Sequence, residues 1–499
     1  MAAVLGSAMA FVDGTLANVA LPALQRVFDA NASQLQWVIE AYSLMLAALL
    51  LVGGALGDRF GRRRIFVIGV AIFVAASLAC AVSNSMNQLI GARALQGVGA
   101  ALLVPGSLAL ISATYPQAER GRAIGIWSAW SGVAAAFGPV LGGYLVDHYS
   151  WRWAFAVNLP FGALLLLICQ LRVPESRSGS TDAVDAVGAA LATLALAGIV
   201  FALIEAPRTD QAAAHWIAAL AVGVVAGMAF VRFEHRVRAP MLPLSLFRAR
   251  DFSGTNLLTL MLYGALGGGL YFVPLMLIQI QGFSATAAGA ALLPFVAIMF
   301  LLSGWAGGLV DRFGPRPPLI VGPLIAALGF AAFALPAAGA SYWSGFLPAV
   351  CILGLGMAVT VAPLTTTVMN AVGAERAGTA SGVNNAVARA AGLLAIAAFG
   401  IVMARVFELR LTEHLRPLAL PGEVMAKVLA QHDKLAALGL PDGLSDPQAQ
   451  ALRHAVSDAF MSGYRGVMLL CAVLCVLAAL SAWTLIARTG DKPERMVGA

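Results

Sequence analysis

Hydrophobic stretches of about 20 residues, separated by short polar segments, follow one another along nearly the whole chain. A helix needs about 20 mostly apolar residues to cross the hydrocarbon core of a bilayer. The pattern therefore predicts an all-α, polytopic membrane protein with fourteen transmembrane helices. The predicted spans are residues 4–24, 37–57, 65–84, 88–112, 122–146, 153–171, 186–205, 214–232, 253–278, 285–310, 318–338, 343–368, 379–404 and 464–487.

The overall composition agrees with a membrane protein. Of the 499 residues, 60% are hydrophobic and 11% are charged, whereas a typical soluble protein has about 25% charged residues. The chain cannot cover its outside with polar groups, so its outside must face lipid. The five cysteines lie inside apolar runs without metal-ligand spacing, so we expect no disulfide, metal site or bound cofactor.

The charge distribution predicts the orientation of the protein. The net charge of +7 is gathered in arginine clusters between apolar runs, such as Arg62 to Arg64 and Arg248 with Arg250. Cytoplasmic loops of membrane proteins are enriched in basic residues, so this charge needs no nucleic-acid partner. It predicts a multi-pass protein of the inner (plasma) membrane with both termini in the cytoplasm. The long segment 405–463 then lies outside, where we expect two short helices.

Two sequence landmarks recur in the same order in both halves of the chain. Asp58-Arg59-Phe60-Gly61 returns as Asp311-Arg312-Phe313-Gly314, and Glu119-Arg120 returns as Glu375-Arg376. Repetition at nearly constant spacing predicts two homologous six-helix bundles of parallel topology. The predicted parts are an N-terminal bundle (1–175), two inserted helices (176–240), a C-terminal bundle with the loop 405–463 (241–488) and a cytoplasmic tail (489–499).

The repeated loop follows the second span of each half, on the side predicted to be cytoplasmic. Its glycines allow a tight turn, and its aspartate can pair with a cation or with the start of a neighbouring helix. Such a pair can hold an inner gate shut. The alternative is a stop-transfer cluster of basic residues, which explains the arginines but not the glycines and aspartates. The gate prediction covers Gly54, Asp58, Arg59, Gly61, Arg63, Arg64, Asp311, Arg312, Gly314 and Arg316.

These segments resemble motifs of the major facilitator superfamily. The repeated loop is similar to its signature loop, Arg93-Ala-Leu-Gln96-Gly97 to its fourth-span motif, and Gly132 to Gly143 to its fifth-span antiporter motif. Asp13-Gly-Thr-Leu-Ala-Asn18 and Trp151-Arg-Trp with Asn158 resemble the fourteen-span drug:proton antiporters, often called EmrB/QacA-type. The resemblance implies the major-facilitator fold. In the second half Pro315 replaces part of the basic triplet, so the two copies of the loop are not equivalent.

Asp13 lies in the middle of the first predicted span, where an unpaired charge is costly and a carboxyl group is a functional candidate. Arg93, near the start of the fourth span, is its candidate partner. The resemblance implies that both take part in proton coupling. We expect Asp13 to be an acid buried between the two bundles. The alternative is a static ion pair that fixes two helices.

Glu40, in the outer part of the second span, is a further proton-coupling candidate. It can carry a proton or attract a cationic substrate, or it can be a carboxylate close to water at the membrane surface. Glu205 and Asp185 lie at the ends of the inserted spans, where we expect them to be solvated.

The fifth-span motif predicts a kinked helix with small residues at a seam between the halves, because proline removes a backbone donor and glycines permit close packing. Its residues are Gly132, Gly138, Pro139, Gly142 and Gly143. Further polar and aromatic residues can line a central cavity. Static bonding between helices explains the two asparagines equally well, and packing or anchoring at the membrane interface explains each tryptophan and tyrosine better. These lining candidates are Asn18, Gln96, Trp127, Trp130, Tyr263, Tyr271, Asn384, Asn385 and Arg389.

The sequence thus predicts a secondary transporter, not an enzyme, that exports small lipophilic or cationic molecules in exchange for protons. No Walker loop is present in the sequence, so the expected energy source is the proton gradient. The rival interpretations are a metabolite exporter or symporter of the same superfamily, and a membrane receptor without net transport. The expected partners are a small molecule, protons and lipid, and the sequence identifies neither the substrate nor a periplasmic adaptor.

Overall fold

The computed structural model describes residues 2–115, 117–176, 185–206, 213–237, 240, 242–372, 377–418, 421–439, 441 and 444–487. Within these ranges the chain is helical and has no strand, which confirms the all-α prediction. The tail 489–499 and Glu375-Arg376, the second copy of the Glu-Arg landmark, lie outside the described residues.

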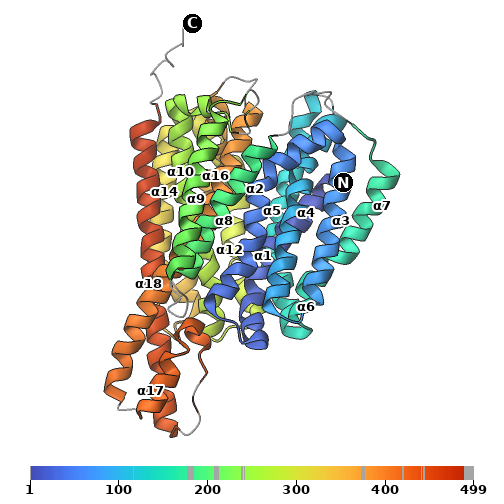
Figure 1. Ribbon diagram of the computed structural model, residues 1–499. Coiled ribbons are helices and arrows are strands. Elements are labelled where there is room, and N and C mark those ends of the chain that lie inside the picture. Colours follow the sequence, from blue (N-terminus) through green and yellow to red (C-terminus); the bar gives the residue numbers. More distant parts are fainter. Residues whose placement is uncertain are drawn as a thin grey trace.

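The helices follow the predicted apolar runs closely (Figure 1). The first group is α1 (Ala2–Phe28), α2 (Ala32–Phe60), α3 (Arg62–Ala81), α4 (Met86–Thr114), α5 (Gln117–His148), α6 (Trp151–Ala156) and α7 (Asn158–Arg172). The inserted pair is α8 (Ala186–Glu205) and α9 (Ala213–Glu234). The last group is η1 (Leu244–Arg248), α10 (Arg250–Gln279), α11 (Ala285–Ala290), α12 (Leu293–Gly307), α13 (Leu309–Phe313), α14 (Arg316–Phe333), η2 (Tyr342–Phe346), α15 (Leu347–Asn370), α16 (Ala377–Leu415), η4 (Arg416–Leu418), α17 (Gly422–Leu429), η5 (His432–Ala437) and α18 (Asp446–Leu485).

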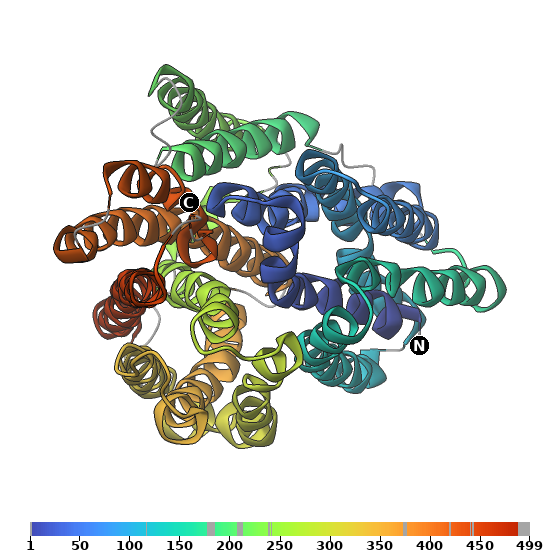
Figure 2. The same ribbon diagram turned by 90° about the horizontal axis from the view of Figure 1, so that it is seen from below.

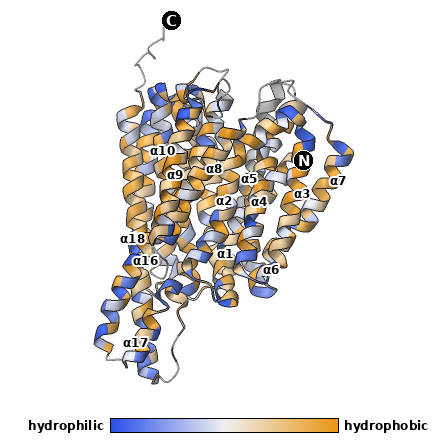
Figure 3. Ribbon diagram, viewed as in Figure 1, coloured by the Kyte–Doolittle hydropathy of each residue, from blue (hydrophilic) through white to orange (hydrophobic). Residues whose placement is uncertain are grey.

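The membrane-spanning character of these helices is clear from their length and composition. Among the described residues, twelve spans are long and apolar enough to cross a bilayer, and α2 adds a thirteenth when its two bent parts count as one. The 32-residue α5 falls where the fifth span is predicted. The total of fourteen stays a prediction. Hydrophobic residues predominate along the helices in the body of the molecule (Figure 3), as expected for helices that lie in lipid.

The spans gather into two groups of packed helices (Figure 2). Helices α1 to α7 contact one another, with α4 against α2 and α3, and α5 against α1. Helices α10 to α18 form the second group, in which α10 packs on α16 and α18, and α15 on α12 and α14. The groups meet where α2 contacts α16 and where α5 contacts α11 and α12. Below they are called the N-terminal and the C-terminal bundle.

Local sequence signals explain where these helices begin and how closely they pack. Asn31 and Gln34 form a capping box at the start of α2, in which each side chain accepts a bond from the other's backbone N–H. At Gly97 on α4, an added Cβ would collide with the carbonyl of Tyr42 on α2. Helices in a bilayer pack tightly through such small residues, because lipid supplies no hydrophobic force between them.

The inserted pair α8–α9 lies at the periphery, where α8 contacts both α2 and α16 (Figure 2). Glu205 at the end of α8 is 6% exposed and accepts hydrogen bonds from Ser33 Oγ (2.8 Å) and Trp37 Nε1 (3.1 Å), both on α2. The prediction of a solvated Glu205 is therefore wrong. Asp185 caps the start of α8 by accepting a bond from the N–H of Gly188. Polar bonds thus attach α8 to the N-terminal bundle.

Glu205→Ala is expected to destabilise the protein by about 1–3 kcal/mol, because the Ser33 and Trp37 donors would stay buried without their acceptor. The measurement is the thermal unfolding midpoint in detergent. Glu205→Gln, which keeps an acceptor oxygen, should lose less, and Glu423→Ala on the exposed surface of α17 should lose nothing. Equal midpoints for Glu205→Ala and the parent protein would contradict the assigned role.

Helices α16 and α18 have 39 and 40 residues, and a helix of that length is about 60 Å long. The hydrocarbon core is about 30 Å thick, so both helices must project well beyond it. Their projecting ends, with α17 and η5, form a polar extension at the lower end of Figures 1 and 3. About half of the segment 405–463 is therefore an extension of two spans, and α17 is the one separate α-helix described in it. We call this side of the molecule the α17 end.

Candidate functional site

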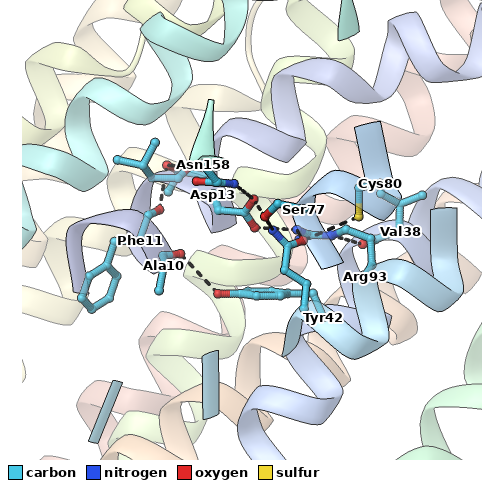
Figure 4. A network of polar contacts seen from close by, with 12 residues as sticks. Ala10, Phe11, Asp13, Val38, Tyr42, Ser77, Cys80, Arg93 and Asn158 are labelled. Carbon is cyan, nitrogen blue, oxygen red and sulfur yellow. Dashed lines mark hydrogen bonds and ion pairs between the residues drawn. The ribbon is translucent and has the colours of Figure 1, made fainter. Parts of the chain in front are cut away.

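Asp13 is held by a dense set of polar side chains (Figure 4). Its carboxylate is 1% exposed and lies 2.5 Å from Arg93 Nη1. Gln96 Nε2 and Asn158 Nδ2 donate to its other oxygen over 2.8 and 2.9 Å. These donors come from α4 and α7, so three partners satisfy one buried charge. The prediction that Arg93 is the partner of Asp13 is confirmed.

Arg93 is also held firmly. It is 0% exposed, donates to Val38 O (3.0 Å) and Gln96 Oε1 (2.7 Å), and lies 4.4 Å above the ring of Tyr42. Gln96 in turn donates to Ser77 Oγ on α3. The Asp13 carboxylate is thus fully satisfied, whereas Nη2 of the Arg93 guanidinium has no hydrogen-bond partner among the described residues. Such bonds offset much of the cost of burying the pair.

The network joins helices within the N-terminal bundle. Its members lie on α1, α2, α3, α4 and α7. The prediction that Asp13 lies between the two bundles is therefore wrong. Sequence spacing places a residue at a depth in the membrane but does not fix which neighbour its face meets. The geometry favours the alternative of a static ion pair that fixes the helices of one bundle.

Glu40 has the opposite environment. It is 0% exposed, so it is not a carboxylate close to water. Among the described residues, neither of its oxygens has a hydrogen-bond partner. A buried carboxylate without donors is costly when charged, and this environment favours the neutral acid.

Glu40 belongs to the face of α2 that meets α16 of the C-terminal bundle. Gln36, one turn earlier, donates to Ile396 O (3.3 Å), and Leu44, one turn later, packs with Leu393 and Ala397. Residues four apart share one face of a helix, so Glu40 lies at the same seam. Tyr271 of α10 is close enough to interact with it electrostatically.

A cavity of about 290 Å³ lies between the bundles toward the α17 end, and its wall includes Gln36 and Tyr271. Apolar side chains such as Phe272, Leu275 and Met403 supply much of the remaining wall, and Gln25 and Gln279 add polar groups. An apolar wall with a few polar groups suits a small lipophilic molecule. Of the predicted lining residues, Tyr271 is on this wall.

The other lining candidates lie elsewhere. Gln96 belongs to the Asp13 network, Trp127 Nε1 donates to Ser7 Oγ, and Trp130 is exposed. Asn384 bonds to Asn256 and Thr259 of α10, and Asn385 bonds to Ser381 O of its own helix. None of these, nor Asn18, Tyr263 and Arg389, is among the described residues that line the cavity. Arg389 instead interacts electrostatically with Tyr42.

The bundles are joined at the α17 end. Asp147, near the end of α5, accepts bonds from the backbone N–H groups of Ala285 (3.1 Å) and Thr286 (2.8 Å) and from Thr286 Oγ1 (2.6 Å) on α11. Gln279 of α10 donates to Gln25 of α1 (2.7 Å). At the other end, the described contacts Arg62–Asp58 and Arg316–Trp483 stay within one bundle. The structure is therefore one in which the α17 end is closed.

The fifth-span glycines serve two different contacts. An added Cβ on Gly138 or Gly142 would collide with α1, inside the N-terminal bundle, whereas one on Gly143 would collide with the backbone of Ala285 in the C-terminal bundle. Gly289 of α11 is equally close to Pro139. The predicted seam between halves thus holds for Pro139 and Gly143 but not for Gly138 and Gly142. Gly132 lies in α5, and nothing is described of its surroundings.

The two copies of the repeated loop have the same turn. Gly61 and Gly314 have φ of +113° and +77°, a region that side chains rarely adopt. In both copies an arginine lies over the next phenylalanine, Arg59 on Phe60 and Arg312 on Phe313. In the first copy Asp58 pairs with Arg62, whose place is taken by Pro315 in the second copy. There the next residue, Arg316, donates to Trp483 O. The role of this loop as a gate stays a prediction.

Several residues at these sites were not singled out from the sequence. Asn158 appeared only as part of a motif, and Ser77, Gln36 and Asp147 not at all. Asn158 and Ser77 are polar residues inside apolar runs, which is the signal that could have found them. Gln36 directly precedes the predicted second span, where a polar residue gives no such signal. Asp147 lies at a helix end, where a carboxylate is ordinary and gives no signal.

Known proteins resemble this chain over most of its length. The model of the Major Facilitator Superfamily matches residues 3–396. The "Multidrug resistance protein Stp" of Mycobacterium tuberculosis (strain ATCC 25618 / H37Rv) is 37% identical over 86% of this chain and 79% of its own. The "Tetracenomycin C resistance and export protein" of Streptomyces glaucescens is 32% identical over 99% and 92%.

A solved structure shows the same fold. A bacterial homolog of the human lysosomal transporter Spinster, in an inward-facing and occupied conformation, superposes with a TM-score of 0.67 at 18% identity, covering 97% of this chain and 95% of that one. The match of the family model over most of the chain agrees with the motifs found in the sequence. The chain therefore belongs to the major facilitator superfamily and is a multi-pass membrane transporter.

Proposed function

We propose that this transporter is a proton-coupled antiporter that exports drugs or other small lipophilic or cationic compounds across the inner (plasma) membrane. The relatives named for multidrug resistance and for tetracenomycin C export support the substrate class. The basic clusters of the sequence support cytoplasmic termini, which puts the α17 end outside. The proton gradient is then the energy source, without a bound cofactor.

The observation that carries the proposal is the environment of Glu40. It is a fully buried carboxyl group to which no described residue donates a hydrogen bond, at a seam that must open and close during transport. With the outer end closed it is neutral. When that end opens, water reaches the carboxyl group and lets it ionise and exchange protons with the outside. Protonation then favours closure, because it removes a charge that is costly to bury.

Asp13 is unsuited to the same task. Its charge is satisfied by Arg93, Gln96 and Asn158 inside one bundle, so a proton would have to displace a cation. We therefore assign Asp13 and Arg93 to the architecture of the N-terminal bundle and the proton to Glu40. This assignment departs from the coupling role that the motif resemblance implies for Asp13 and Arg93.

Everted membrane vesicles test the function directly. After respiration has acidified the lumen, an added substrate should dissipate the pH gradient, because each substrate molecule pumped into the lumen is exchanged for protons that leave it. Vesicles without the transporter are the control. A receptor without net transport, or a symporter, would leave the pH gradient undissipated. An undissipated gradient with each of a panel of drugs for which the relatives are named would exclude antiport.

Gly143→Ala is expected to slow export, because the added methyl group meets the backbone of Ala285, which cannot swing away as a side chain can. Overpacking of this kind costs about 1–3 kcal/mol and acts on the closed outer end alone. The measurement is the initial rate of substrate efflux, normalised to the amount of protein in the membrane. The matched control is Gly304→Ala, where an added Cβ meets nothing within 4 Å. Similar slowing in both variants would show that the Gly143 contact has no special role.

A further inference from the structure

The segment η5 belongs to the extension beyond α16 but contacts both bundles. It packs on α16 and α18 and also on α1 and α2. It lies at the α17 end, over the cavity between the bundles, and His432, Asp433 and Leu435 form part of the cavity wall. A segment in this position separates the cavity from the outside.

Two polar contacts fasten η5 to the N-terminal bundle. Lys434 Nζ lies 2.6 and 2.7 Å from the two carboxylate oxygens of Asp29, which connects α1 to α2. Gln25 of α1 donates to the carbonyl of Lys434 over 3.0 Å. Because Gln25 also accepts from Gln279 of α10, one amide ties together α1, α10 and η5.

The backbone of η5 is strained at Leu435, one of the residues of the cavity wall. Leu435 has φ of +53°, although it is not glycine, and its side chain is 7% exposed. Such a conformation persists where the surrounding contacts impose it. The contacts in this case are the bonds on Lys434 and the burial of Leu435 between the bundles.

From this geometry we propose that η5 is an outer plug, which closes the mouth of the cavity by inserting Leu435 and is held in place by Lys434 on Asp29 and Gln25. The plug goes beyond the proposed antiport. It rests on the proposed function only for the assignment of the α17 end to the outer side of the membrane. It would make exit of a substrate depend on a segment outside the membrane. The bundles themselves close through Asp147 and α11, a separate contact.

A charge swap with a chemical reporter tests the plug. Ala404, on the cavity wall, is replaced by Cys after the five native cysteines have been substituted. Spheroplasts are treated with a membrane-impermeant, positively charged methanethiosulfonate reagent. Asp29→Lys and Lys434→Asp, each alone, break the ion pair between these residues and should speed labelling by about threefold or more. A larger change is not needed, because a partly exposed ion pair contributes little free energy. The double variant, with the charges exchanged, should return to the slow parental rate.

Two further variants sharpen the result. Leu435→Gly removes both the inserted side chain and the strain, and should speed labelling with the Lys434–Asp29 pair intact. The control exchange of Arg410 and Glu413, an ion pair within the projecting part of α16, should change nothing. Parental labelling rates in both single charge variants, or no recovery in the double variant, would overturn the plug. Labelling requires neither substrate nor a proton gradient, so the outcome is independent of whether antiport is correct.

Discussion

Replacing Glu40 by Gln is expected to abolish coupling, lowering substrate-induced dissipation of the pH gradient in everted vesicles by at least about tenfold, because the only change is loss of the titratable group. Gln has nearly the shape of the neutral acid, so the closed structure should form normally. Folding and insertion should therefore match the parent protein, and binding of a substrate should remain measurable in detergent.

The controls separate the carboxyl group from its surroundings. Glu40→Asp keeps a titratable group one methylene shorter and should retain part of the coupling. Gln36→Glu would introduce a second acid one turn away, on the same face of α2, and in the Glu40→Gln background it should restore some coupling. Full coupling in Glu40→Gln would refute the assignment of the proton to this residue.

The second large effect is expected at Arg93. In Arg93→Gln the carboxylate of Asp13 would remain buried without its cation, and removal of one partner from a buried pair costs about 3–5 kcal/mol. The amount of folded protein in the membrane and its thermal midpoint should both fall strongly. The measurement is fluorescence-detected size exclusion together with thermal unfolding in detergent.

A double variant decides whether the Asp13 network is structural. Asp13→Asn with Arg93→Gln has no unpaired charge and retains amide hydrogen bonding, so it should be more stable than Arg93→Gln alone. Asp13→Asn alone should lose export only as far as it loses folded protein. A well-folded Asp13→Asn variant with uncoupled transport would instead return the proton to Asp13.

The contrast between these two acids is the physical basis of the proposed mechanism. Both are buried in spans of the N-terminal bundle. Asp13 has an ion pair and two hydrogen bonds, whereas Glu40 has no donor within the part of the chain that the structure describes. A satisfied charge holds a structure in place. An unsatisfied one makes its protonation state depend on whether the seam is open, and that dependence is what coupling requires.

The sequence by itself determined the membrane-embedded, all-α architecture, the positions of nearly all helices and the family. These follow from local properties, because apolar length decides whether a segment can lie in lipid and glycine motifs mark turns such as Gly61 and Gly314. It also identified Asp13, Arg93 and Glu40 as the intramembrane charges that need an explanation.

The tertiary structure alone decided how those charges are used. Whether a carboxyl group is paired depends on which helix face meets which neighbour, and residues 80 apart, such as Asp13 and Arg93, come together only through packing. The same holds for Glu205 against Ser33 and for Lys434 against Asp29, which are separated by 172 and 405 residues. The position of a residue along an apolar run sets how deep it lies in the membrane. It does not specify the neighbour of that residue, because lipid and protein interior are equally apolar.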